Sequence, residues 1–206
     1  MIIGADYIQL VGHAVFRADP HDLQNLVTKP VHAIGRIVDI RVVERLALLR
    51  ILANAPVALE AYLAASGINA RSSLSIGERE AVQITAAAVH GCAYCVAGHS
   101  LRAERKAKLD RVVVCELRDR ARVNDTKLDA VARFAEAVIV SRGNVTDDEL
   151  ARFRNAGFTD QAALEIVLGV SLATLCNFAN NLAHAPINEE LKEYLWTPPA
   201  CSVGIV

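Results

Sequence analysis

Cysteine is scarce in this sequence, and neither sign of charge is in clear excess. The 206 residues contain five cysteines, which is too few and an odd number for a disulfide framework. The formal net charge of −1 argues against nucleic acid or an anionic membrane surface as the main partner. The first dozen residues contain Asp6 and lack the basic start of a secretory signal. We therefore expect a protein of the reducing cytoplasm, where a close cysteine pair is redox-active or binds metal.

The sequence also lacks a glycine-rich phosphate loop and any segment with the clear pattern of a β-strand. One run, 166–188, has no formally charged residue and is long enough to span a bilayer. Unpaired amides are costly in lipid, so Asn177, Asn180 and Asn181 favour a buried core helix over a membrane span. Apolar residues make up 53% of the chain, and such a surplus of apolar surface predicts a homo-oligomer.

Helical patterns account for most of the chain and predict an all-α protein. Residues 41–53 carry a helical stripe of apolar side chains. Two capping boxes predict helix starts, one at Ser75 with Glu78 and one at Thr146 with Glu149. The last long helix begins at Thr159 or Asp160 and places five large apolar residues on one face: Leu164, Leu168, Leu175, Phe178 and Leu182.

Three regions follow from these patterns. Residues 1–36 contain Pro20 and Pro30 and read as an N-terminal extension. Residues 37–190 form the predicted helical domain. Residues 191–206 read as a C-terminal tail that packs on a neighbouring subunit.

A dithiol and an imidazole stand out in an apolar segment. Cys92 and Cys95 form a Cys-x-x-Cys pair, and His99 follows four residues later. Residues 81–101 contain no Lys, Arg, Asp or Glu, and Glu80 lies at the edge of this segment. On a helix that starts near Cys92, both thiols and the imidazole share one face through i+3 and i+4 spacing. In the first turn of such a helix, free N–H groups and the helix dipole favour a thiolate at Cys92.

The position of Glu80 predicts a bend in the chain. In one continuous helix Glu80 lies about 28 Å from His99, at ~1.5 Å per residue. Gly91 is suited to the left-handed cap that ends a helix. If the chain folds back there, Glu80 lies eleven residues before the bend and His99 eight after it. We therefore predict a central helical hairpin that brings the Glu80 carboxylate to the His99 ring.

This constellation resembles the carboxymuconolactone decarboxylase superfamily and, within it, the alkyl hydroperoxidase AhpD-like branch. The shared pattern is a Glu, eleven residues and then Cys-x-x-Cys-x-x-x-His, and the resemblance spans residues 41–187. It implies an AhpD-like all-α fold, a trimer or hexamer, and peroxidase activity without metal, flavin or haem. It also implies a lipoyl-bearing or thioredoxin-like protein as electron donor. The best-studied peroxidase-type members have a His between the cysteines, where this chain has Tyr94.

The predicted activity is that of a thiol-dependent peroxidase or disulfide reductase. A thiolate attacks the O–O bond of a hydroperoxide and becomes a sulfenic acid, which condenses with the second thiol to a disulfide and water. A dithiol donor then restores the pair by exchange. We expect His99 to act as base or ion-pair partner and Glu80 to hold its ring. The helix-terminus argument favours Cys92 as the attacking thiol. The resemblance favours Cys95, and for peroxide chemistry we follow it because His99 lies i+4 from Cys95.

Three alternatives remain open from the sequence. Cys92, Cys95 and His99, with Glu80 or His90 as fourth ligand, match the ligand types of a zinc site. A lyase like the superfamily's decarboxylases is the second, although the resemblance implies that those members typically do not rely on a Cys-x-x-Cys pair. A non-catalytic oligomeric scaffold is the third.

Overall fold

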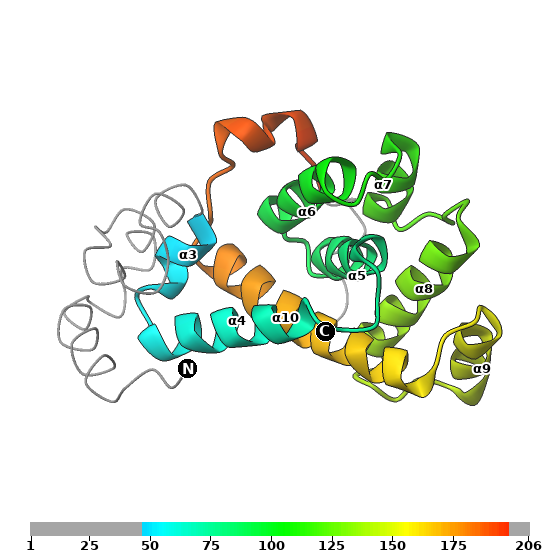
Figure 1. The fold of residues 1–206 in the computed structure, drawn as a ribbon. Helices are drawn as coiled ribbons and strands as arrows, with labels where there is room; N and C mark the ends of the chain where they lie inside the picture. The colour runs from blue at the N-terminus through cyan, green and yellow to red at the C-terminus, as the bar shows by residue number, and fades with distance from the viewer. Residues whose placement is uncertain (1–46, 198–206) are drawn as a thin grey trace.

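The structure, a computed structural model, describes residues 47–197, and every regular element in that range is a helix (Figure 1). The predicted all-α class is therefore confirmed. The predicted N-terminal extension, 1–36, lies outside the described residues. In chain order the helices are α3 (Ala47–Leu52), α4 (Pro56–Asn69), α5 (Ile76–Val89), α6 (Ala93–Arg105), α7 (Arg111–Arg118), α8 (Thr126–Val140), α9 (Asp147–Asn155), α10 (Asp160–Leu182) and the 3-10 helix η2 (Glu189–Tyr194).

Side-chain caps define the starts of several helices. The Ser75 hydroxyl accepts from the backbone N–H of Glu78, whose carboxylate accepts from the backbone N–H of Ser75 at 2.6 Å. Thr146 and Glu149 form the same reciprocal box at α9, and Thr159 caps α10. These contacts satisfy N–H groups that a helix N-terminus leaves unpaired. Both capping boxes lie where the sequence predicts them.

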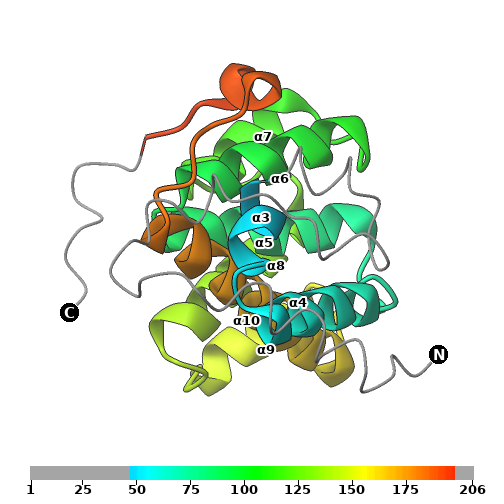
Figure 2. The ribbon, with the colours of Figure 1, turned by 90° about the vertical axis from the view of Figure 1, so that its left-hand side faces the viewer.

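Helix α5 lies at the centre of the molecule. It packs along α6, α8 and α10 (Figures 1 and 2), and its residues 81–88 are all buried. At its end His90 occupies the C-cap, and Gly91 adopts the left-handed conformation with φ of +67°. This residue turns the chain so that α6 returns along α5. The resulting hairpin positions the candidate site.

The hydrophobic core has two main parts. In the first, Phe153 is almost fully buried and stacks between Phe134 and Phe158, with ring centroids 4.4 and 4.6 Å apart. The second surrounds Cys92 and Cys95 with apolar side chains from several helices. The cysteine pair therefore lies inside apolar packing.

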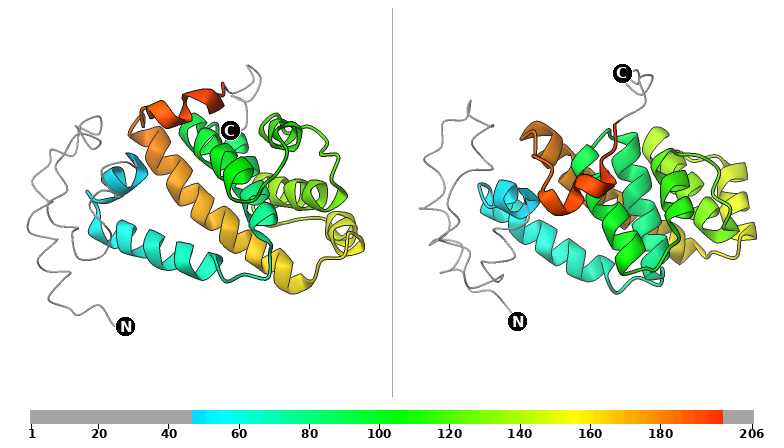
Figure 3. Two further views of the ribbon diagram at one scale, coloured as in Figure 1. Left: turned by 45° about the horizontal axis from the view of Figure 1, so that its top comes forward. Right: turned by 90° about the horizontal axis from the view of Figure 1, so that it is seen from above.

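Helix α10 crosses the molecule and packs against α3, α4, α5, α6 and α8 (Figure 3). By length and composition alone it is apolar enough to cross a membrane. Its packing against five other helices fits the core helix that the sequence predicts. At Gly169 an added Cβ would lie 3.1 Å from Cγ1 of Val82, so the missing side chain lets α10 approach α5 closely.

The large apolar face of α10 is not the face that this chain buries. Leu164, Phe178 and Leu182 are 71%, 56% and 58% exposed. The inward face instead carries mostly small or polar side chains: Ala162, Ile166, Gly169, Leu172, Ala173, Cys176, Asn177 and Asn180. Because α10 has apolar residues around its whole circumference, the spacing of its largest side chains does not identify its buried side.

The first part of the expected C-terminal tail packs onto its own chain. Leu191 and Tyr194 of η2 are buried, and η2 contacts α6. The Tyr194 hydroxyl donates to Oε2 of Glu104 at 2.7 Å, and Arg118 donates to the Tyr194 carbonyl at 3.1 Å. The described residues after α10 are therefore tied to α6 and α7.

Candidate active site

The two predicted thiols lie at the N-terminal end of α6. Cys92 occupies the N-cap, one residue before the helix, and Cys95 lies in its first turn. Both are buried, at 1% and 5% exposure. The sequence pattern predicts Cys92 inside the first turn rather than at the cap. The cap position has the same electrostatic consequence, because unpaired N–H groups of the first turn point toward it.

Hydrogen bonding makes the two sulfurs unequal. A bond from the Cys95 thiol lowers the pKa of Cys92, burial opposes this, and the backbone N–H groups of Cys95 and Tyr94 lower it further, so the net direction is down. The same thiol pairing, together with burial, raises the pKa of Cys95. The dithiol therefore favours a thiolate on Cys92. This electrostatic order is the reverse of the one that the resemblance implies.

Glu80 and His99 meet across the hairpin. Nδ1 of His99 lies 2.7 Å from Oε2 of Glu80, and Nε of Arg102 lies 2.9 Å from Oε1. Burial raises the pKa of the Glu80 carboxyl, but the charges and hydrogen bonds of His99 and Arg102 outweigh burial, so its pKa is lowered. Glu80 is therefore a buried carboxylate that two neighbours keep ionised.

Three asparagines of α10 line the other side of the site. Asn180 is buried and donates from Nδ2 to Sγ of Cys95 at 3.1 Å. Asn177 donates to Nδ1 of His90 at 3.0 Å, and Asn181 donates to the His90 carbonyl at 3.0 Å. From the sequence, these amides are evidence against a membrane span, and buried backbone or subunit contacts are favoured for them over hydrogen bonds near the site. Their concentration in an uncharged helix is the signal that would have pointed to a polar site.

Two further residues, one partly buried and one buried, pack in the same apolar cluster as the thiol pair. Tyr62 comes from α4 and Cys176 from α10. Burial raises the pKa of each side chain to about 12. Both groups therefore stay protonated near neutral pH, and Cys176 does not compete with Cys92 as a thiolate. Neither residue lies within the Glu80–His99 motif, and so sequence spacing does not identify them.

Comparison with known proteins concerns the family and the fold of the chain. Residues 54–137, which include all four predicted site residues, match the model of the Carboxymuconolactone decarboxylase family. The resemblance to that superfamily is confirmed. The fold is similar to the crystal structure of an alkylhydroperoxidase AhpD core, an uncharacterized peroxidase-related protein from Ralstonia eutropha, with a TM-score of 0.67 and 23% identity. The match covers 81% of this chain and 90% of that chain, which confirms the AhpD-like fold. No curated protein matches the chain.

Tyr94 has a packing role in this AhpD-like fold. It is buried, and its hydroxyl accepts from the backbone N–H of Ala47 at 3.2 Å. Burial raises the pKa of Tyr94, which keeps the phenol protonated. The residue therefore ties α6 to α3.

The zinc alternative finds no support in the site geometry. Across residues 47–197, no three His, Cys, Asp or Glu side chains are grouped as metal ligands. Both oxygens of Glu80 are engaged, by His99 and by Arg102. The other candidate fourth ligand, His90, uses Nδ1 to accept from Asn177.

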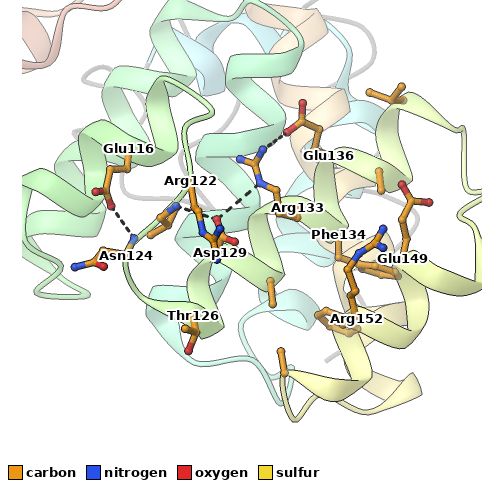
Figure 4. Close-up of a pocket in the computed structure, with 16 residues that line it drawn as sticks. Glu116, Arg122, Asn124, Thr126, Asp129, Arg133, Phe134, Glu136, Glu149 and Arg152 are labelled. Atoms are coloured by element: carbon orange, nitrogen blue, oxygen red, sulfur yellow. Dashed lines mark hydrogen bonds and ion pairs between the residues drawn. The ribbon is translucent and has the colours of Figure 1, made fainter.

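An open pocket lies apart from the thiols, between α7, α8 and α9 (Figure 4). Its lining includes none of the four predicted site residues. The guanidinium of Arg133 lies 3.2 Å from Glu136 and 4.0 Å from Asp129. Since both acidic and basic side chains line it, the pocket presents no single-sign surface for a ligand.

Proposed function

We propose that the protein is a thiol-dependent peroxidase or disulfide reductase. The observation that carries the proposal is the 2.7 Å contact between Glu80 and His99 beside a buried dithiol at the start of α6. The similarity to a peroxidase-related AhpD core supports the same class of chemistry. In this proposal Cys92 and Cys95 are the redox pair, and no metal, flavin or haem takes part.

The structure supports Cys92 as the attacking thiol. Its thiolate attacks one oxygen of a hydroperoxide ROOH, the O–O bond breaks, and a proton is taken up to give a Cys92 sulfenic acid and ROH. The Cys95 thiol then attacks the sulfenic sulfur, which forms the Cys92–Cys95 disulfide and releases water. Two thiols and one hydroperoxide thus give one disulfide, one alcohol and one water. A dithiol donor restores the pair and is itself oxidised to a disulfide.

His99 and Glu80 supply the proton transfer in this scheme. With Glu80 ionised and accepting from Nδ1–H of His99, the Nε2 lone pair is free to accept a proton. The Cys95 thiol needs such a base, because its pKa is raised and it must lose a proton to attack the sulfenic acid. This role uses the i+4 spacing of Cys95 and His99 on α6.

The partners are proposed on the same basis. Both sulfurs are buried, which favours a small hydroperoxide as the oxidant. A lipoyl-bearing or thioredoxin-like dithiol protein is the proposed electron donor, in a reducing cytoplasm. A homo-oligomer, a trimer or hexamer, is the proposed assembly. Nucleic acid and membranes are not proposed as partners.

The test is peroxide consumption with a panel of dithiol donors, namely dithiothreitol, dihydrolipoamide and reduced thioredoxin. We expect turnover by the unmodified protein and its loss in Cys92→Ser and in Cys95→Ser. Cys115→Ser is the matched control, because Cys115 is an exposed free thiol outside the site. Equal rates in the two site variants and the unmodified protein would contradict the proposal. Absence of peroxide turnover by the unmodified protein would instead favour the lyase or scaffold alternative.

A further inference from the structure

Arg102 is the residue at this site whose contact the proposed mechanism leaves unused. It lies on α6, three residues after His99, and donates from Nε to Oε1 of Glu80 at 2.9 Å. The other oxygen of the same carboxylate faces Nδ1 of His99 at 2.7 Å. The Arg102 side chain is 59% exposed, whereas that of Glu80 is only 4% exposed. Arg102 thus reaches from the surface to a buried charge.

The protonation state of Glu80 decides what His99 can do. An ionised Glu80 accepts from Nδ1–H, which leaves the Nε2 lone pair available as a base. A protonated Glu80 would donate toward Nδ1, and the ring proton would then sit on Nε2. In that tautomer His99 has no free nitrogen with which to accept a thiol proton. The site therefore needs Glu80 to stay ionised although it is buried.

We propose that Arg102 is a positioning residue for the thiol chemistry, which holds the Glu80 carboxylate ionised and turned toward His99. The inference rests on the proposed function for its consequence in catalysis, but the Arg102–Glu80 contact exists independently of it. An exposed ion pair contributes little because water screens both charges. Here one partner is buried, so the loss of the guanidinium leaves a carboxylate that His99 alone must stabilise.

The direct test is a titration of the Glu80 side-chain carboxyl by carbon-13 NMR, with Glu80→Gln used to identify its signal. In Arg102→Met we expect the midpoint of Glu80 to rise by about one pH unit, because an opposite charge within hydrogen-bonding distance is lost. Arg102→Gln serves as a second variant in case the Met variant does not fold. Arg105→Met removes an equal charge from the same helix. No described contact links Arg105 to Glu80, so the midpoint of Glu80 in this variant should match that in the unmodified protein. Equal Glu80 midpoints in the unmodified protein and in the Arg102 variants would overturn the inference.

The second readout is the pH dependence of peroxide consumption. The acid limb should move to higher pH by about one unit in Arg102→Met, so that the rate on that limb falls by up to about tenfold while the rate near pH 8 stays the same. Arg102→Lys, which keeps the charge but not the planar donor geometry, should restore part of the shift. An equal loss of rate at every pH would mean a merely structural role. If the unmodified protein consumes no peroxide, the proposed function fails, and the NMR titration still decides the role of Arg102.

Discussion

At the scale of single residues, the site depends on an asymmetry between two neighbouring sulfurs. Cys92 accepts hydrogen bonds from one thiol and two backbone N–H groups, and the pKa of Cys92 falls. Cys95 donates its proton to Cys92 and accepts from Asn180. The amide, the Cys95 thiol and the Cys92 sulfur thus form a chain in which each donor strengthens the next. Negative charge accumulates at the end of the chain, on Cys92.

The asymmetry predicts the order of alkylation. In the reduced protein at pH 7, limited iodoacetamide treatment should modify Cys92 before Cys95, because the thiolate is the nucleophile. The fraction modified at Cys92 should reach its midpoint below the usual pH of about 8.5. Both cysteines lie between Arg79 and Arg102 on one tryptic peptide, so tandem mass spectrometry assigns the label. Modification of Cys95 before Cys92 would contradict this prediction and favour Cys95 as the attacking thiol, as the resemblance implies.

Asn180 should affect the pKa of the Cys92 thiol although its hydrogen bond is to Cys95. Asn180→Leu removes the donor to Cys95, weakens the Cys95 thiol as a donor to Cys92, and should shift Cys92 alkylation up by about 0.5 pH unit. Asn181→Ala is the control, because Asn181 is exposed and its side-chain amide donates to the His90 carbonyl and not to a thiol. The contrast is measured by rates of iodoacetamide labelling against pH. Identical profiles for both variants would exclude Asn180 from the thiol network.

The main residues of the candidate site can be predicted from the sequence, whereas the residues that surround them cannot. Glu80 and His99 were predicted to meet because a bend at Gly91 is the simplest way to bring them together. Arg102 and Asn180 belong to the same site, but neither has a spacing that distinguishes it from surface charge or core amide. Their roles follow from the packing of α10 and α6 on α5, which only the structure supplies.

At the scale of the element, the hairpin depends on the conformation of one residue. Gly91 has φ of +67°, where a Cβ clashes with the backbone. Gly91→Ala should therefore lower the free energy of unfolding by about 1 kcal/mol. Chemical denaturation monitored by circular dichroism measures the change.

Gly98 is the matched control for this prediction. It lies inside α6, and apart from its own helix no described residue has an atom within 4 Å of a Cβ added there. Gly98→Ala should raise the free energy of unfolding by about 0.5 kcal/mol, because alanine is the better helix former. If the two substitutions change the free energy of unfolding in opposite directions, the loss at Gly91 comes from backbone strain and not from a general effect of replacing glycine in this hairpin. A Gly91→Ala variant as stable as Gly98→Ala would show that the bend tolerates an ordinary residue.

Helix starts were predictable because capping is a local property of the chain. Ser75 with Glu78 and Thr146 with Glu149 satisfy N–H groups within their own first turns, so no distant contact is required. The buried side of α10 and the packing of η2 were not predictable in this way. Both are decided by contacts with helices far away in sequence, and α10 carries apolar residues on its exposed face as well as on its buried one.

At the scale of the whole molecule, we propose that the exposed apolar face of α10 is where a second copy of the chain would bind. Leu164 and Leu182 are both largely exposed, and their separation of 18 residues equals five helical turns, so they lie on one line. We expect Leu164→Glu and Leu182→Glu to reduce the molar mass measured by light scattering after size exclusion. Val112→Glu is the control, because Val112 is 68% exposed but lies on α7. An unchanged mass in the two α10 variants would exclude this face as the interface.

The central claim, that Cys92 and Cys95 form a peroxide-reducing pair, is tested most directly by a single turnover. Fully reduced protein receives one equivalent of hydrogen peroxide, its remaining thiols are alkylated, and the cysteines are mapped by mass spectrometry. We expect the loss of two thiols per peroxide and a disulfide that joins Cys92 to Cys95, with Cys115 and Cys176 still reduced. Recovery of both Cys92 and Cys95 as alkylated thiols after the peroxide treatment would contradict it.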